Sequence, residues 1–185
     1  MVFDGARHES VARYPSLAER AFIVSSFGKT YHVTGWKVAY CAAPQALMAE
    51  FRKVHQFVVF TVHAPSQYAI AAYMQHNSHL QLSAFYQAKR DFFLTEVQQN
   101  ANETLRWQHS AGSYFVSASY GHASNLSARD FAQKLVCEVG VACIPTSAFY
   151  HDAHDDKIVR FCFAKKDETL ARAATLLRNI DAALG

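Results

Sequence analysis

The chain has 185 residues, 51% of them hydrophobic, and a formal net charge of +3. This length is sufficient for one large or two small hydrophobic cores, and the composition is typical of a globular protein rather than a disordered one. No run or stripe of Lys and Arg indicates nucleic-acid binding, and no stretch of about 20 apolar residues predicts a membrane span. The N-terminus lacks the basic and apolar regions of a signal peptide, so we expect none.

The predicted elements alternate between helices and short strands. We expect helices at residues 15–20, 45–56, 65–75, about 78–100, 128–138 and 167–184, and strands at residues 21–26, 36–43, 104–108, 114–119, 141–144 and 157–163. Pro44 and Ser127 mark helix starts, Asn77 or Ser78 is the expected cap of the long helix, and Gly140 is typical of a helix end. Residues 58–62 predict a loop or a distorted helix end. A domain boundary is expected within the long helix, near residues 78–90.

A polar segment between two apolar runs is the main candidate site. Residues 21–24 predict a short buried strand, and Ser26, Lys29 and Lys37 follow it, where α/β proteins usually bind ligands. Lys29 has two interpretations: a surface lysine, or an amine that forms a Schiff base. Lys37 could lower the pKa of Lys29 if both face one cavity, or it could hold a phosphate. Ser26 could donate its hydroxyl to the same anion.

Arg160 is the second candidate. It lies in a predicted strand of alternating faces, where it shares a face with Ile158 and Cys162. An arginine among apolar residues needs an anionic partner, because an unpaired buried charge is very costly. Either a structural Asp or Glu or the carboxylate of a substrate could supply that charge.

Histidines and cysteines offer weaker candidates. Residues 151–156 have the residue types of a metal site, but a solvated loop is the favoured interpretation, and we expect no metal. The cysteines, Cys41, Cys137, Cys143 and Cys162, form no C-x-x-C pair. They indicate reduced core thiols of a cytoplasmic protein, with neither a disulfide nor a zinc framework.

Ser26-x-x-Lys29 followed after seven residues by Lys37, with Val33-Thr34-Gly35-Trp36 between them, closely resembles the pyridoxal-phosphate lysine region of class I/II aminotransferases. The resemblance is strongest to the methionine and kynurenine–glutamine aminotransferase branch. It continues through residues 3–5, 112–115, 140–142 and 160–165, so it covers nearly the whole chain. By this resemblance Lys29 carries pyridoxal 5'-phosphate (PLP), Ser26 and Lys37 bind its phosphate, and Arg160 binds the substrate carboxylate.

The resemblance also implies an α/β fold of fold type I. Residues 1–80 would be the C-terminal portion of the PLP-binding large domain, and residues 81–185 the long interdomain helix and an α+β small domain. The implied reaction moves an amino group from a large apolar, thioether or aromatic amino acid to a 2-oxo acid, in a cytoplasmic homodimer. A preference for such substrates follows if Tyr31, Trp36, Phe57, Phe60 and Tyr114 line the pocket.

Only the second half of such an enzyme is matched. The upstream strings Asn-Pro-x-Asn-Pro and Asp-Glu-x-Tyr, which provide further cofactor contacts in relatives, do not occur here. Two alternatives therefore stay open: a PLP-dependent C–S β-lyase, and a truncated fragment without catalytic activity. The first part of the sheet would also be absent, which predicts an unpaired strand edge.

Overall fold

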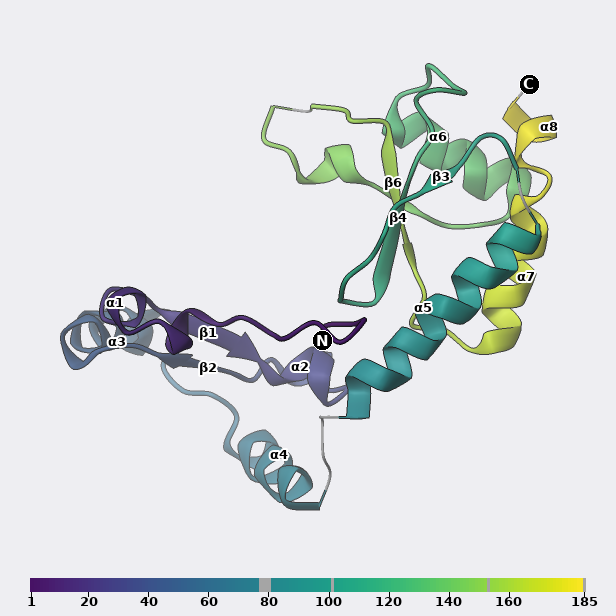
Figure 1. Cartoon of the computed structure of the whole chain (residues 1–185). Coiled ribbons are helices and arrows are strands. Elements are labelled where there is room, and N and C mark those ends of the chain that lie inside the picture. The colour runs from purple at the N-terminus through teal and green to yellow at the C-terminus, as the bar shows by residue number, and fades with distance from the viewer. Residues whose placement is uncertain (77–80, 101, 153, 185) are drawn as a thin grey trace. The chain divides into compact units, whose positions relative to one another are not determined.

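The computed structural model describes residues 1–76, 81–100, 102–152 and 154–184 (Figure 1). The chain forms two compact units. One, here called the lysine unit, is Arg7–Leu82, and the other, here called the arginine unit, combines Met1–Ala6 with Ser83–Gly185. The inclusion of the first six residues in the arginine unit was not expected from the sequence.

The lysine unit contains short helices around a two-stranded ribbon. Its elements are α1 (Pro15–Ala18), β1 (Ile23–Ser26), α2 (Phe27–Thr30), β2 (Ala39–Ala42), α3 (Gln45–Val58) and α4 (Ala64–His76), with 3₁₀ turns at Val11–Arg13 and Thr34–Trp36. β1 and β2 are antiparallel, with Ile23 opposite Ala42 and Ser26 opposite Ala39. The expected cap at Asn77 or Ser78 lies outside the described residues.

The prediction of a buried strand at residues 21–24 is wrong for this chain. Phe22 and Val24 are 47% and 68% exposed, and Tyr40 on the neighbouring strand is 49% exposed. The reason is that β1 and β2 pair only with each other in the described part of the chain. A two-stranded ribbon cannot bury both of its faces, so its apolar side chains stay in contact with solvent.

α3 begins after Pro44, as predicted, and extends to Val58. Its end is distorted: the backbone N–H groups of Val59 and Phe60 both donate to His55 O, and Phe60 has a φ of 63°. Phe57 and Phe60 are each 85% exposed, so among the described residues nothing covers them as the wall of a substrate pocket would.

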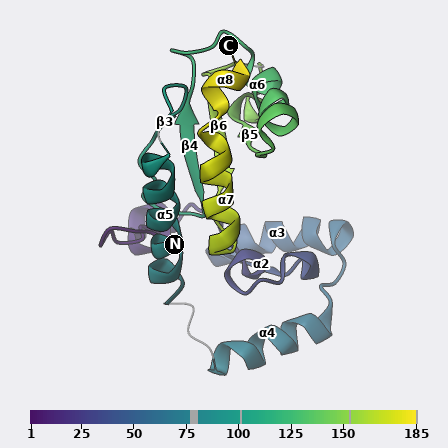
Figure 2. The ribbon, with the colours of Figure 1, turned by 90° about the vertical axis from the view of Figure 1, so that its right-hand side faces the viewer.

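The arginine unit is built on a four-stranded antiparallel sheet of order β3-β4-β6-β5. The strands are β3 (Arg106–Trp107), β4 (Phe115–Ser119), β5 (Ile144–Pro145) and β6 (Ile158–Cys162), and the helices are α5 (Leu82–Gln99), α6 (Ala128–Lys134), α7 (Asp167–Leu177) and α8 (Ile180–Leu184). β3 and β5 are shorter than predicted. Figures 1 and 2 show α5, α6 and α7 on the same side of the sheet.

Alternate residues of the two central strands separate a buried face from a half-buried one. Val116 and Ala118 of β4, and Val159 and Phe161 of β6, are at most 3% exposed. They face the helices, and the ring of Trp107 lies 5.1 Å from Phe161 and 5.5 Å from Phe93 of α5. The intervening residues, including Arg160, are half-buried on the other face, which confirms the predicted alternation.

Two helices begin and end close to the predicted residues but are less regular than predicted. Ser127 caps α6 as expected, by accepting a hydrogen bond from Asp130 N at 3.1 Å, but the helix continues as a π-helical segment, Leu135–Val139, up to Gly140 with φ 81°. The closing helix is divided into α7 and α8 around Arg178, whose Nε donates to Asn100 Oδ1 at 3.0 Å.

The remaining expectations concern cysteines and the membrane. The four cysteines are free, but Cys137 is exposed and the other three are only half-buried, so the prediction of core thiols is wrong for Cys137 and is met only in part by the others. Within the described ranges no helix is both long enough and apolar enough to cross a bilayer.

Candidate active site

The candidate lysine lies in the single turn of helix that follows β1. Ser26 is the N-cap of α2, and its Oγ accepts a hydrogen bond from Gly28 N at 3.1 Å. Such a cap satisfies one of the free N–H groups of a helix start and fixes where the helix begins. Lys29 therefore follows the cap by three positions, and both side chains are exposed.

Gly28 holds the segment after Lys29 in a closed turn. Its carbonyl accepts from Val33 N at 2.9 Å and from Thr34 Oγ1 at 3.2 Å. A Cβ atom at this position would lie 3.0 Å from Thr34 Cα and 3.2 Å from Ser26 Oγ. The turn that carries Lys29 is thus tightly packed, although the lysine itself is exposed.

Lys37 lies at the same end of the ribbon as Ser26. It has a left-handed backbone with φ 56°, and the following residue, Val38, accepts a hydrogen bond from Phe27 N at 3.2 Å. The structure therefore places Ser26, Lys29 and Lys37 at one end of the ribbon: Ser26 pairs with Ala39, Lys29 follows Ser26 by three residues and Lys37 precedes Ala39 by two. All three side chains are exposed.

The chemistry of these donors fits an anionic phosphate. From Arg20 to Ala49 the sequence contains no Asp or Glu. Neither Lys29 nor Lys37 takes part in the ion pairs found among the described residues. Two ammonium groups without a counterion, together with a hydroxyl, can donate hydrogen bonds to an incoming anion.

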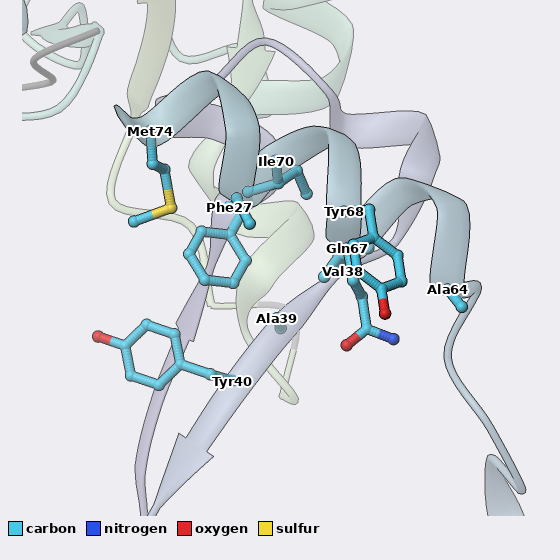
Figure 3. Close-up of a pocket in the computed structure, with 10 residues that line it drawn as sticks. Phe27, Val38, Ala39, Tyr40, Ala64, Gln67, Tyr68, Ile70 and Met74 are labelled. Carbon is cyan, nitrogen blue, oxygen red and sulfur yellow. The ribbon is translucent and has the colours of Figure 1, made fainter. Parts of the chain in front are cut away.

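An apolar pocket, separate from the three donors, lies between β2 and α4 (Figure 3). It measures about 610 Å³ and is lined by Phe27, Val38, Tyr40, Tyr68, Ile70 and Met74, among others. Ser26, Lys29 and Lys37 are not part of its lining. We therefore do not assign this pocket to the cofactor.

Arg160 occupies the half-buried face of the other unit, on β6. It pairs with Ser117 of β4 on one side and Ile144 of β5 on the other. Its guanidinium carbon lies 3.9 Å from the centre of the Phe115 ring and 4.8 Å from that of the Phe149 ring. Among the described residues its buried Nε has no hydrogen-bond partner.

Arg160 thus has two aromatic rings as neighbours, and not the structural Asp or Glu that was one of the two partners expected from the sequence. None of the ion pairs found in the described ranges includes it. The alternative of a structural Asp or Glu partner therefore finds no support in that part of the chain. Neither ring was expected from the sequence, because Phe115 reaches Arg160 only through the pairing of β4 with β6, which places it diagonally from the arginine.

The acidic loop before β6 has a structural role. Asp155 accepts from Ala128 N at 2.7 Å, at the start of α6, and from Lys157 N at 2.9 Å. Asp156 accepts from Tyr150 Oη at 2.6 Å, and His154 Nε2 lies 2.5 Å from its other oxygen. In the described part of the chain no group of three or more His, Cys, Asp or Glu side chains is arranged to hold a metal ion.

Comparison with known proteins identifies the family. Residues 1–177 match the family described as aminotransferase class I and II. The chain belongs to the class I and II aminotransferases. This confirms the predicted family and, with the structural neighbours below, the predicted α/β fold of fold type I.

Individual relatives in this aminotransferase family are similar over almost the whole chain. It is 44% identical to a methionine aminotransferase of Escherichia coli over 96% of its length, and 32% identical to a human kynurenine–oxoglutarate transaminase over 97%. Among solved structures, a protein from Escherichia coli with a methionine aminotransferase function has a TM-score of 0.89 over 97% of this chain. For an N-succinyldiaminopimelate aminotransferase of Mycobacterium tuberculosis the TM-score is 0.86 over 96%.

The chain spans only about half the length of these relatives. It covers 46% of the bacterial methionine aminotransferase and 47% of the human transaminase. Each of these two relatives thus contains a further polypeptide portion of similar size that this chain does not match.

Proposed function

We propose that this chain provides the cofactor lysine and the substrate arginine of an aminotransferase. In this proposal the complete enzyme moves the amino group of a large apolar, thioether or aromatic amino acid to a 2-oxo acid. The observation that carries the proposal is the set of exposed donors, Ser26, Lys29 and Lys37, at one end of the β1–β2 ribbon, where neither lysine has an ion-pair partner among the described residues. The similarity to methionine and kynurenine aminotransferases supports the substrate class.

In the proposed site Lys29 holds pyridoxal 5'-phosphate through its Nζ atom, while Ser26 and Lys37 donate hydrogen bonds to the phosphate. When bound, this cofactor supplies an electron sink that stabilises negative charge at the substrate Cα. Once the amino group of the substrate has taken the place of Lys29 on the cofactor, Lys29 Nζ would act as the general base that moves the proton from the substrate Cα to the cofactor carbon. The absence of acidic residues from Arg20 to Ala49 favours anion binding at this place.

Arg160 is proposed to bind the substrate carboxylate. Its guanidinium has a buried Nε–H without a partner among the described residues, so a donor is available. The planar guanidinium group can form two parallel hydrogen bonds with a carboxylate, which lysine cannot.

The proposal extends to domains, assembly and compartment. Residues 1–80 would contribute to the PLP-binding large domain, and residues 81–185 would form the interdomain helix and the small domain. We further propose a homodimer in the cytoplasm, where free thiols such as those of Cys41 and Cys137 stay reduced.

The test is the visible spectrum of the purified chain with added PLP, recorded for the wild type, Lys29→Ala and Lys53→Ala. Lys53 is an exposed lysine of α3 paired with Glu50, so it controls for reaction at surface amines. After unbound PLP has been removed, we expect the absorption band of protein-bound PLP in the wild type and in Lys53→Ala, and no such band in Lys29→Ala. A band that persists without Lys29, or no band in the wild type, would contradict this role of the chain.

The reaction type needs a separate assay with the complete enzyme. Methionine and a 2-oxo acid are supplied, and the products are identified. A new amino acid together with a new 2-oxo acid indicates amino transfer. Release of ammonia and pyruvate from cystathionine would instead indicate a C–S lyase.

A further inference from the structure

The immediate surroundings of the Arg160 guanidinium are aromatic. Phe115 approaches it from β4, with 3.9 Å between the guanidinium carbon and the ring centre. Phe149 approaches from the 3₁₀ turn Thr146–Phe149, at 4.8 Å. Both distances are within the range of a cation–π contact, in which the ring face attracts the positive charge.

We propose that Phe115 and Phe149 are positioning residues that hold the Arg160 guanidinium ready for the carboxylate of the substrate. This inference rests on the proposed function, because it assumes that Arg160 binds a carboxylate. A ring face stabilises the cation without providing a strong hydrogen-bond acceptor for the guanidinium N–H groups. A structural Asp or Glu would stabilise the same charge but would also occupy those donors.

The Nε–H group of Arg160 supports the proposal that the guanidinium donors are kept available for a carboxylate. The Nε atom is buried and has no hydrogen-bond partner among the described residues. A buried donor without a partner is costly, so native structures retain one mainly where a ligand or an ordered water completes the bond. A carboxylate that accepts hydrogen bonds from the guanidinium fits this requirement.

The turn that carries Phe149 is fixed to the strand that carries Arg160. Thr146 Oγ1 donates to Ile158 O at 2.9 Å, and Ile144, just before the turn, pairs with Arg160 itself. Phe149 is nevertheless 64% exposed. A ring that is so exposed contributes little to the core, so its contact with Arg160 can be removed without unfolding the unit.

The test measures Arg160 directly, without the cofactor. The full chain is labelled with ¹⁵N, and the Nε–Hε resonance of Arg160 is assigned by its loss in Arg160→Lys. L-methionine is then titrated, with L-methioninamide, which lacks the carboxylate, as the matched ligand. We expect methionine to shift the Arg160 resonance and methioninamide to leave it unchanged.

The variants then separate positioning from general packing. Phe149→Leu should raise the dissociation constant for methionine about two- to fivefold, the range expected for one lost cation–π contact. Phe149→Tyr keeps a ring face and should restore the wild-type value. Phe85→Leu is the control and should leave the dissociation constant unchanged. Phe85 is also exposed, at 52%, but the cation over its ring is Lys89 on α5 and not Arg160.

Several results would overturn the inference. They are an unchanged affinity in Phe149→Leu, a failure of Phe149→Tyr to restore it, or no shift with methionine in the wild type. Phe115→Leu, checked for folding by circular dichroism, should weaken binding in the same way, and wild-type affinity in that folded variant would also count against it. The PLP band depends on Lys29 and not on these rings, so loss of the band alone would contradict the proposed function and not the positioning role.

Discussion

Arg90 donates hydrogen bonds to both carboxylate oxygens of Asp4, at 2.7 and 2.6 Å, and so connects two segments that are 86 residues apart. Arg90 is only 5% exposed, and it also donates to Ser110 O at 2.6 Å. Its hydrogen bonds to Asp4 hold the pKa of that carboxyl below its ordinary value. This ion pair attaches the first residues of the chain to α5.

The Asp4–Arg90 pair predicts a pH dependence of stability. Because the folded-state pKa of Asp4 is lowered, the carboxylate stabilises the fold above its unfolded pKa of about 4, and this contribution is lost as the pH falls through the folded value. Asp4→Asn should therefore be less stable than the wild type at pH 7, and the difference should shrink below about pH 4. Urea unfolding at several pH values measures this; a difference that stays constant down to pH 2 would contradict the prediction.

A second prediction concerns the packing around Gly28. Gly28→Ala adds a Cβ atom only 3.0 Å from Thr34 Cα, and overpacking of this kind costs about 1–3 kcal/mol of unfolding free energy. Gly35→Ala is the matched control, since nothing lies within 4 Å of a Cβ at that position. Denaturant unfolding of both variants, followed by the PLP spectrum, tests whether the Lys29 turn has been displaced. Equal stability of the two variants would show that the turn can relax.

A third prediction separates the structural and metal-binding interpretations of the acidic loop. Asp155→Ala removes the acceptor for Ala128 N at the start of α6, and the loss of such a cap costs about 1 kcal/mol. Asp152→Ala, in the same loop, should cost less, since among the described residues the Asp152 side chain accepts only a 3.2 Å hydrogen bond from His154 N, two residues away. A chelator should leave the thermal unfolding of the wild type unchanged. A lower melting temperature with chelator would instead indicate a bound metal.

A fourth prediction tests the stacked rings of Tyr120, which follows β4, and Phe131 of α6. The rings of Tyr120 and Phe131 lie 3.7 Å apart, and both residues are fully buried. Phe131→Ala should cost about 3–5 kcal/mol, because it leaves a cavity in the core. Tyr120→Phe should cost about 1 kcal/mol or less, since Leu126 O, the acceptor of its hydroxyl, also accepts from Lys157 Nζ at 2.8 Å. Denaturant unfolding of the two variants gives both values, and a larger cost for Tyr120→Phe would contradict this account.

Local signals predicted much of the fold. Pro44 before α3, Ser127 before α6 and Gly140 after the π-helical segment mark boundaries through backbone chemistry that acts within a few residues. The alternation of side chains along a strand correctly predicted that Arg160 shares a face with Ile158 and Cys162, but not that the opposite face, with Val159 and Phe161, is the buried one.

Features that depend on distant residues were not predictable in this way. Nothing near Asp4 in the sequence indicates Arg90, and Phe149 reaches Arg160 only because β5 pairs with β6. The apolar residues around β1 were read as buried, yet Phe22 and Val24 are exposed in this chain. An apolar pattern shows that a strand is suited to burial, but burial itself depends on which partners cover it.

The place of Phe3 in the arginine unit also has a consequence during synthesis on the ribosome. Its side chain is 1% exposed, and its ring lies 6.3 Å from that of Phe163, near the other end of the sequence. The lysine unit is continuous in sequence and can begin to fold as soon as it has left the exit tunnel. The arginine unit must wait until the residues around Phe163 have been translated, so Phe3 stays without its native neighbours, and available to chaperones, while the whole lysine unit is synthesised.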